Sequence, residues 1–204
     1  MFDARLRKSI DPALDMIAQR IVSTGIGANT ITWFGFAIGA GAAFAIYNQA
    51  YWLGLVLILF SRLCDGLDGT VARLNGKTDL GGYLDIVLDF AFYGIIPLAF
   101  IWANPAENWA AGSLLLTVFY INGASFLCFA LIAEKRGTSE VERGTKSFLY
   151  SIGLAEAGET LAVFILFCLF PTWFSAIAYV FSGVVLVTTG LRFSEAYKDF
   201  SDRK

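Results

Sequence analysis

Long apolar runs alternate with short polar breaks along most of the chain. Six such runs of about 20 residues lie at about 30–48, 52–73, 81–102, 109–133, 148–170 and 173–191. A helix needs roughly 20 predominantly apolar residues to cross a hydrocarbon core of about 30 Å. The pattern therefore predicts an all-α integral membrane protein with six transmembrane helices.

The first 21 residues follow a different pattern. Apolar residues recur mostly every four positions from Phe2 to Ile21, and charged side chains lie between them. This spacing is typical of an amphipathic helix in the membrane interface, and it lacks the uninterrupted apolar core of a signal peptide. Pro12 would disturb the helix, so two shorter pieces are an alternative. We expect a single domain over 1–204, made of a juxtamembrane amphipathic segment (1–28), a six-helix bundle (29–192) and a cytoplasmic tail (193–204).

The basic residues are distributed unevenly between the connections. All fifteen precede the first span, surround the second-to-third connection, fill the fourth-to-fifth loop or follow the sixth span. The positive-inside rule places these four regions, and therefore both termini, on the cytoplasmic side. The groups are Arg5, Arg7, Lys8 and Arg20; Arg62, Arg73 and Lys77; Lys135, Arg136, Arg143 and Lys146; and Arg192, Lys198, Arg203 and Lys204.

The amino-acid composition limits which domains and which catalytic groups the protein can have. The chain is 57% hydrophobic and 16% charged, which leaves no room for a separate soluble domain. Cys64, Cys128 and Cys168 lie far apart in apolar runs, so we interpret them as small core residues rather than as a disulfide framework or a zinc site. Because the chain has no histidine, a general base would be a carboxylate or a less common group.

Four aspartates lie in two short clusters within this apolar sequence. Asp65 and Asp68 are three residues apart, and Asp85 and Asp89 are four apart, so each pair would project from one face of its own helix. Residues 74–80 are polar enough to form a turn between the two helices. We therefore expect the two pairs to meet in one site on the cytoplasmic side.

Such a cluster needs positive charge, since a carboxylate near the centre of a membrane helix costs roughly 2.5–3.5 kcal/mol. Arg62, Arg73 and Lys77 are few and would also serve an anionic substrate. Hard divalent cations with oxygen ligands, one or two Mg2+ or Mn2+, are the better expectation. Gly66 and Gly69 would let a pyrophosphate approach the backbone, and Arg73 could fork onto a phosphate. These features indicate metal-assisted phosphoryl-group chemistry, with direct transfer favoured and a covalent step left open.

The order of these residues resembles a known signature. Asp-x-x-Asp-Gly-x-x-Ala-Arg, seven further residues and Gly-x-x-x-Asp-x-x-x-Asp are carried by Asp65, Asp68, Gly69, Ala72, Arg73, Gly81, Asp85 and Asp89. This resembles the motif of the CDP-alcohol phosphatidyltransferases, which build phospholipids from a CDP-linked alcohol. The resemblance implies six helices around a cytoplasm-facing polar cavity, and a homodimer. The compact chain looks like bacterial members, which implies the bacterial inner membrane.

The resemblance also implies roles for individual residues. Asp65, Asp68 and Asp85 would be ligands of two metal ions, and Asp89 would be shared between metal binding and catalysis as the base that deprotonates the acceptor hydroxyl. The hydroxyl would then attack the lipid-side phosphorus and CMP would leave. Asn29 or Thr30 could cap the first span, and for Asn29 and Thr32 an ordinary capping role is as good an interpretation as a role in binding CDP. The CDP group would bind Asn29, Thr32, Gly69, Arg73 and Thr78.

The acceptor site is less well defined. Lys146, Arg143 and Arg192 could hold the phosphate of glycerol 3-phosphate or an inositol phosphate, or they could simply follow the positive-inside rule. Intramembrane acids usually face a cavity or a partner. We therefore expect Glu156 and Glu159 to line the active-site cavity or to pair with a basic neighbour such as Arg192, and a purely structural ion pair is the alternative.

The leading hypothesis is a transferase that moves a phosphatidyl group from CDP-diacylglycerol to a small alcohol or phosphorylated alcohol. One alternative reverses the substrates, with CDP-choline or CDP-ethanolamine donating to diacylglycerol. A divalent-cation transporter and a catalytically inactive scaffold are alternatives from other classes. The spacing of glycine and arginine disfavours the transporter, and the four intact aspartates disfavour the scaffold. We expect the lipid bilayer as a partner and no nucleic acid.

Overall fold

The computed structural model of the chain describes residues 2–136 and 157–201. In those two ranges every regular element is a helix, so the all-α prediction is confirmed. The elements are α1 (Phe2–Ser23), α2 (Ala28–Tyr47), α3 (Tyr51–Asn75), α4 (Asp79–Ala103), α5 (Pro105–Lys135), α6 (Ala157–Leu169), the short 3-10 turn η2 (Pro171–Trp173) and α7 (Phe174–Ser201).

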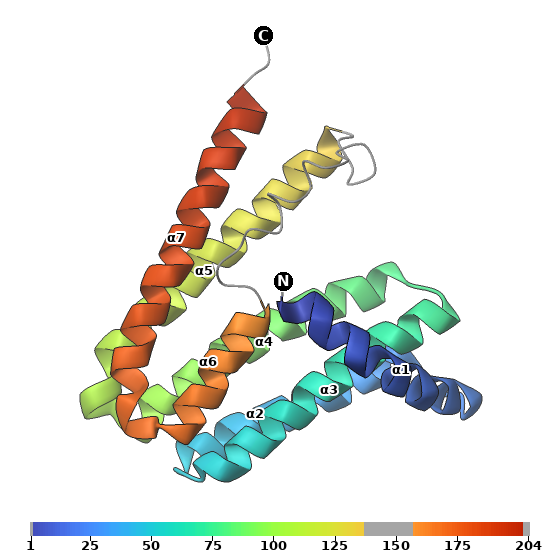
Figure 1. Cartoon of the computed structure of the whole chain (residues 1–204), viewed down its shortest axis with the longest axis horizontal. Helices are drawn as coiled ribbons and strands as arrows, with labels where there is room; N and C mark the ends of the chain where they lie inside the picture. Colours follow the sequence, from blue (N-terminus) through green and yellow to red (C-terminus); the bar gives the residue numbers. More distant parts are fainter. Residues whose placement is uncertain (1, 137–156, 202–204) are drawn as a thin grey trace.

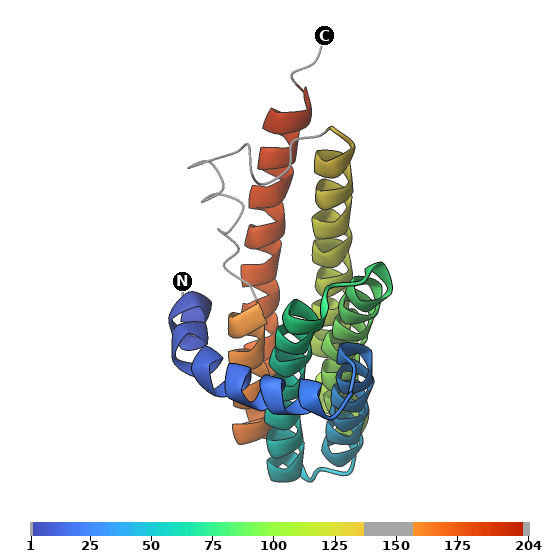
Figure 2. The same cartoon turned by 90° about the vertical axis from the view of Figure 1, so that its right-hand side faces the viewer.

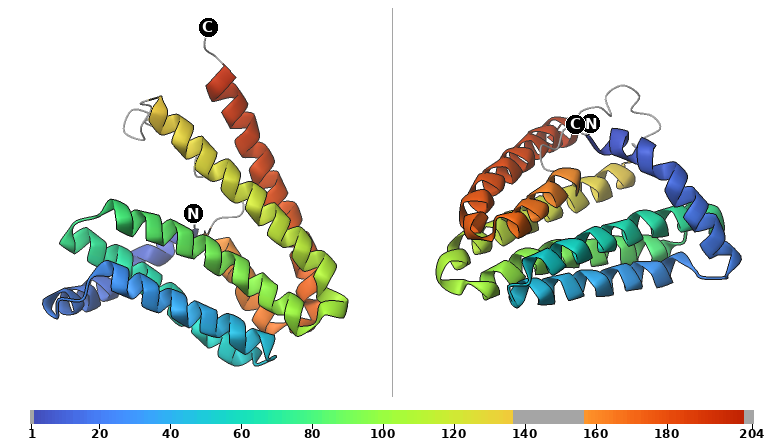
Figure 3. Two further views of the ribbon diagram at one scale, coloured as in Figure 1. Left: turned by 180° about the vertical axis from the view of Figure 1, so that it is seen from behind. Right: turned by 60° about the horizontal axis from the view of Figure 1, so that its bottom comes forward.

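The helices form two groups that share α4. Helix α2 packs against both α3 and α4, and α5 packs against α4 and α7 (Figures 1 and 3). The shorter α6 lies against α3 and α7. Helix α1 packs on α3 and runs across the direction of the other helices, as Figure 2 shows. This orientation supports the expectation that α1 lies in the membrane interface, which stays a prediction.

Within residues 2–136 and 157–201, four helices are long and apolar enough to cross a membrane: α2, α4, α5 and the segment Pro171–Ser201. Helix α3 is as long as α4 at 25 residues, but from Arg62 onward it carries charges that include Asp65 and Asp68. The expected fifth span at 148–170 is described only from Ala157 onward, as the 13-residue α6. A membrane-spanning architecture is therefore supported, and the count of six spans stays a prediction.

Several helix boundaries differ from the sequence-based expectation. Helix α2 begins at Ala28 with Gly27 as its N-cap and no side-chain cap, so the interpretation of Asn29 or Thr30 as a cap is wrong. Helix α1 runs through Pro12 without a break between Phe2 and Ser23. Helix α1 thus follows the expectation of one helix rather than the alternative of two pieces. The capping error arises because capping propensities are weak and tertiary packing overrides them.

The C-terminal helices are longer than the apolar runs that predict them. Helix α5 begins at Pro105, a residue that suits the first turn because its missing N–H is not needed there. Helix α7 continues past Leu191 to Ser201, so most of the expected polar tail is helical. The apolar run predicts the part of a helix that lies in lipid, and the polar continuation remains helical beyond it.

An aromatic cluster holds α6 and the η2 turn against the rest of the bundle. Phe100, Phe167 and Phe174 are fully buried, and their ring centroids lie 4.5–5.4 Å apart. Cys168 is buried beside them, as expected of a core residue, whereas Cys128 is exposed on α5 and its assignment to the core is wrong. This cluster joins α4 to α6 and α7 at the end of the bundle where η2 lies.

Two glycines allow α2 to approach α3 and α4 closely. The Ser61 hydroxyl donates a hydrogen bond to the Gly35 carbonyl at 2.8 Å, which joins the α2 and α3 backbones. A Cβ atom at Gly39 would lie 2.7 Å from the Phe92 ring and 3.0 Å from the Ser61 hydroxyl. Because the ring is fully buried, it has little space to move away. The packing of α3 and α4 on α2 therefore depends on Gly39.

We predict that Gly39→Ala lowers the free energy of unfolding by about 1–3 kcal/mol, because the added methyl group overpacks this contact. Gly41→Ala in the same helix is the matched control, since its Cβ would lie 3.9 Å from Leu57 Cδ1, at ordinary contact distance. Thermal unfolding of the purified protein in detergent measures both. Equal melting temperatures for the two variants would contradict the packing argument.

Candidate active site

The two aspartate pairs lie on consecutive helices joined by a tight connection. Helix α3 ends at Asn75, and α4 begins at Asp79. Gly76 has φ +94°, a conformation that residues with a side chain rarely adopt. Thr78 caps α4, because its hydroxyl accepts a hydrogen bond from the Gly81 N–H at 3.1 Å. The turn predicted over 74–80 is thus present in a shorter form.

The structure brings the two pairs to one place. All four aspartates line a cavity of about 10 Å³ between α2, α3 and α4, which we call the aspartate cavity. Asp65 and Asp68 reach it from α3, and Asp85 and Asp89 reach it from α4. Its polar lining residues are Thr32, Ser61, Arg62, Asp65, Asp68, Asp85 and Asp89.

Positive charge in this cavity comes from Arg62. Its Nη1 atom lies 2.6 Å from Asp89 Oδ1 and 3.4 Å from Asp65 Oδ1. Its guanidinium carbon lies 3.9 Å from the centre of the Phe92 ring. The expectation that basic side chains do not serve as counter-charges for the aspartates is therefore wrong for Arg62. The spacing of three residues from Arg62 to Asp65 could have indicated this pair.

Asp68 is the most buried of the four aspartates. The residue is 4% exposed, and Thr32, whose hydroxyl donates a hydrogen bond to the Ala28 carbonyl at 3.1 Å, lines the same cavity. Its Oδ2 atom is buried without a hydrogen-bond partner in the described part of the chain. An unpartnered buried carboxylate oxygen is costly, and a bound cation would satisfy it. The oxygen-only donor set of the cavity also fits Mg2+ or Mn2+.

A closer arrangement would be needed for one ion to bind three of these side chains. Within residues 2–136 and 157–201, no group of three or more aspartate, glutamate, cysteine or histidine side chains is placed closely enough to hold a metal ion. The metal-ligand roles of Asp65, Asp68, Asp85 and Asp89 therefore stay a prediction, which the orphaned oxygen of Asp68 supports.

Of the residues expected to bind CDP, one lines the aspartate cavity and others lie on the helices that form it. Asn29 and Thr78 meet at the start of α4, where a Cβ on Gly81 would lie 3.1 Å from Asn29 Oδ1 and 3.0 Å from Thr78 Oγ1. Gly81 is thus needed for this approach. Thr32 lines the cavity itself, and Gly69 follows Asp68 on α3.

Arg73 is the expected CDP-binding residue that does not reach the aspartates in this structure. It is exposed near the end of α3, and its Nη2 atom donates a hydrogen bond to the Thr70 hydroxyl at 2.7 Å. The guanidinium therefore lies along its own helix. It is placed to meet a phosphate that arrives at the open end of the site, and this role stays a prediction.

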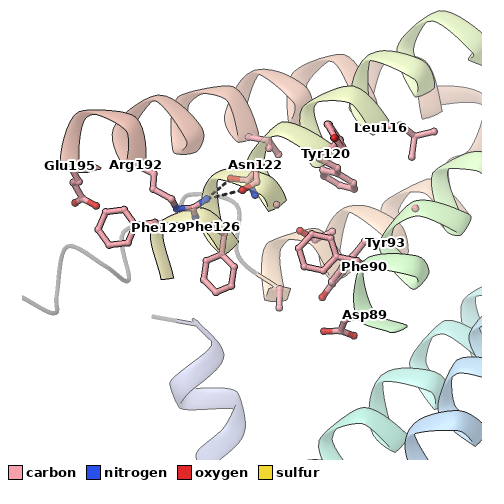
Figure 4. A pocket seen from close by; sticks show the side chains of 16 residues that line it. Asp89, Phe90, Tyr93, Leu116, Tyr120, Asn122, Phe126, Phe129, Arg192 and Glu195 are labelled. Carbon is pink, nitrogen blue, oxygen red and sulfur yellow. Dashed lines mark hydrogen bonds between the residues drawn. The ribbon is translucent and has the colours of Figure 1, made fainter. Parts of the chain in front are cut away.

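A second and larger cavity begins at Asp89. It has a volume of about 600 Å³ and lies between α4, α5, α6 and α7, and we call it the apolar cavity. Figure 4 shows Asp89 at one end and Arg192 with Glu195 at the other. Its aromatic lining consists of Phe90, Tyr93, Phe119, Tyr120, Phe126 and Phe129, and its polar lining of Asp89, Asn122, Thr160, Arg192 and Glu195. Asp89 lines both cavities.

Asn122 holds Arg192 in place at the far end of the apolar cavity. Arg192 Nη1 donates hydrogen bonds to Asn122 Oδ1 at 2.9 Å and to the Asn122 carbonyl at 3.1 Å, drawn as dashed lines in Figure 4. The Thr189 hydroxyl lies 3.1 Å from the same Oδ1 atom. Sequence reasoning missed Asn122 and Glu195. A lone asparagine in an apolar span, and the spacing of three residues from Arg192 to Glu195, were the available signals.

The other residues expected at the acceptor site either lie outside the described residues or do not line the apolar cavity. Arg143, Lys146 and Glu156 lie outside the described residues. Glu159 is half-buried in the first turn of α6, but the residues of α6 that line the apolar cavity are Ala157 and Thr160. Of the acceptor-site predictions, the structure therefore places only Arg192 in a cavity that Asp89 also lines.

Comparison with known proteins assigns the chain to a family. A profile of the CDP-alcohol phosphatidyltransferases matches residues 25–191. The inner membrane protein YnjF of Escherichia coli is 42% identical, with 97% of this chain and 96% of that protein covered. The archaetidylinositol phosphate synthase of Pyrococcus horikoshii is 27% identical, with 82% of each chain covered.

A solved structure supports the fold. The phosphatidylinositol phosphate synthase PgsA1 of Mycobacterium tuberculosis with CDP-DAG bound has a TM-score of 0.67 and 21% identity, over 90% of this chain and 93% of that one. Its complex with manganese and citrate has a TM-score of 0.65 and 20% identity, over 90% and 88%. The profile match and the identity to YnjF extend over far more than the aspartate motif. The chain therefore belongs to the CDP-alcohol phosphatidyltransferase family of membrane transferases in phospholipid biosynthesis.

Proposed function

We propose that the protein transfers a phosphatidyl group from CDP-diacylglycerol to a small phosphorylated alcohol, with release of CMP. The observation that carries this proposal is the position of Asp89 between two cavities. The aspartate cavity on one side has the donor set for cation-assisted pyrophosphate chemistry, and the apolar cavity on the other side has room for an acceptor. Family membership supports a transferase over a cation transporter.

The donor would bind at the aspartate cavity. Its cytidine diphosphate would lie against Asn29, Thr78 and the end of α3, where Gly69 leaves the backbone open. Asp65, Asp68 and Asp85 would hold two Mg2+ or Mn2+ ions, with Asp89 shared. Such ions neutralise the non-bridging oxygens of a pyrophosphate and stabilise the leaving CMP. The PgsA1 structures with CDP-DAG and with manganese are those of a protein with the same fold.

Asp89 would act as the general base. It accepts the proton of the acceptor hydroxyl, the hydroxyl oxygen bonds to the lipid-side phosphorus, and the bond from that phosphorus to CMP breaks. In this structure Asp89 Oδ1 lies 2.6 Å from Arg62 Nη1, and the same carboxylate borders the apolar cavity from which an acceptor hydroxyl would approach.

An anionic acceptor suits the far end of the apolar cavity. Arg192 presents a guanidinium there, and Asn122 fixes two of its hydrogen bonds. A forked guanidinium matches a phosphate group well. Relatives that carry names of inositol phosphate lipid synthases make an inositol phosphate the first acceptor to test, with glycerol 3-phosphate next.

The likeness to an E. coli inner membrane protein supports a location in a bacterial inner membrane. We place both termini and the aspartate cavity on the cytoplasmic side because all fifteen basic residues fall in the regions that the positive-inside rule assigns there. A homodimer is part of the same proposal and follows from the family alone.

Purified protein in nanodiscs should release CMP from CDP-diacylglycerol only with Mg2+ or Mn2+ and a suitable acceptor. Asp89→Asn should lower kcat by at least about 100-fold, since it removes the base, while binding of the CDP-lipid is largely kept. Asp79→Asn, an exposed carboxylate in the first turn of the same helix, is the matched control.

Two results would count against this assignment. Normal turnover of Asp89→Asn would remove Asp89 from the mechanism. Product formation from CDP-choline or CDP-ethanolamine with diacylglycerol, and none from CDP-diacylglycerol, would show that diacylglycerol is the acceptor and the CDP-linked alcohol is the donor.

The acceptor-binding role of Arg192 predicts how Asn122 acts. Asn122→Ala should raise the KM for a phosphorylated acceptor about tenfold with little change in kcat, because the guanidinium loses its orienting partner. In the background of Arg192→Gln, the same substitution should add little, since both act through one contact. Thr117→Ala on the same helix, whose hydroxyl donates a hydrogen bond to the Ser113 carbonyl of α5, is the control. Independent and additive effects on KM would show that Asn122 does not act through Arg192.

A further inference from the structure

Arg62 joins the two acidic helices from a buried position. Its side chain is 15% exposed, and one nitrogen, Nη1, reaches carboxylate oxygens on both α3 and α4, at 3.4 Å for Asp65 and 2.6 Å for Asp89. Charge-assisted hydrogen bonds as short as the second are among the strong ones. The guanidinium therefore neutralises part of the acidic cluster from within.

Two aromatic rings also contact the Arg62 guanidinium. Its central carbon lies 3.9 Å from the Phe92 ring centre and 5.9 Å from the Tyr93 ring centre. Arg62 Nε is buried and has no hydrogen-bond partner in the described part of the chain. A buried cation with incomplete hydrogen bonding is retained because of its charge partners, which here are Asp65 and Asp89.

The two halves of the cavity differ in charge balance. Asp65 and Asp89 share the Arg62 cation, whereas neither Asp68 nor Asp85 forms a salt bridge within residues 2–136 and 157–201. Asp68 Oδ2 is buried and unpartnered in the same part of the chain. The Asp68 half is therefore open to a cation, and the Asp65–Asp89 half is engaged by one.

We propose that Arg62 is a resident counter-cation that competes with a divalent metal ion for Asp65 and Asp89. Binding of an ion to this half requires Nη1 to give up its carboxylate contacts, whereas the Asp68 half takes an ion without that competition. Arg62 thus keeps the acidic helices together when metal is scarce and raises the metal concentration at which the second half fills. This inference rests on the proposed metal site.

The test is a Mn2+ titration of the full-length chain in nanodiscs, with free Mn2+ measured by electron paramagnetic resonance. Wild-type protein should show one tighter and one weaker class of site. Arg62→Gln, which removes the competing charge, should tighten the weaker class about tenfold. Arg62→Lys keeps the charge but loses the fork and the ring contact, and its effect should be smaller in the same direction. Arg20→Gln, at an exposed arginine on α1, is the matched control and should match wild type.

Stability without metal gives an independent measurement. In EDTA, Arg62→Gln should melt at a lower temperature than wild type because Asp65 and Asp89 then lack their shared cation. Mn2+ should raise the melting temperature of this variant by more than it raises that of wild type. Should Arg62→Gln fail to fold, wild-type protein with 15N-labelled arginine serves instead. Its Arg62 side-chain resonance, assigned by its loss in Arg62→Lys, should shift with saturable dependence on Mg2+.

The outcomes separate this inference from the proposed function. Equal or weaker Mn2+ binding by Arg62→Gln, or an Arg62 resonance that stays fixed while Mg2+ binds, would overturn the competition and leave the metal site in place. No Mn2+ binding by either wild type or Arg62→Gln would overturn the metal site and the competition together.

Discussion

The repulsion among four carboxylates in one small cavity is the constraint on which the rest of this structure depends. Arg62 relieves part of it by contacting an aspartate on each of two helices. Its position rests on the Phe92 ring, and the ring in turn fits because Gly39 on α2 has no side chain. Apolar packing between α2, α3 and α4 thus supports a charge arrangement that the membrane-spanning helices could not hold separately.

Helix α4 connects this acidic centre to the rest of the bundle. Asp89 on α4 lines the aspartate cavity and also the apolar cavity, which α5, α6 and α7 complete. A donor with a charged pyrophosphate and an acceptor with a separate anionic group could then meet at one carboxylate. The two cationic groups belong to different cavities and different helices, with Arg62 on α3 in the aspartate cavity and Arg192 on α7 in the apolar cavity.

The positions of most helices follow from the local pattern of apolar residues, whereas two expectations for individual residues were wrong. The apolar runs predict α2, α3, α4 and α5 close to their observed bounds, and also the start of α7, because lipid requires each span to satisfy its backbone hydrogen bonds internally. The capping role expected of Asn29 was wrong since Gly27 occupies the N-cap, and Cys128 is exposed although its run is apolar. In a membrane protein an apolar residue can face lipid as well as the core, so hydropathy alone does not separate the two.

The sequence by itself determined the helical class, the pairing of the aspartates on the faces of two consecutive helices, and the family to which their spacing belongs. These features depend on residues close together in the chain, where helical periodicity sets geometry directly. Only the tertiary structure decided that Arg62 serves both Asp65 and Asp89, that Asp89 borders a second cavity, and that Asn122 orients Arg192 across 70 residues. Those contacts form between helices, and their packing angles and rotamers depend on the whole bundle rather than on any local pattern.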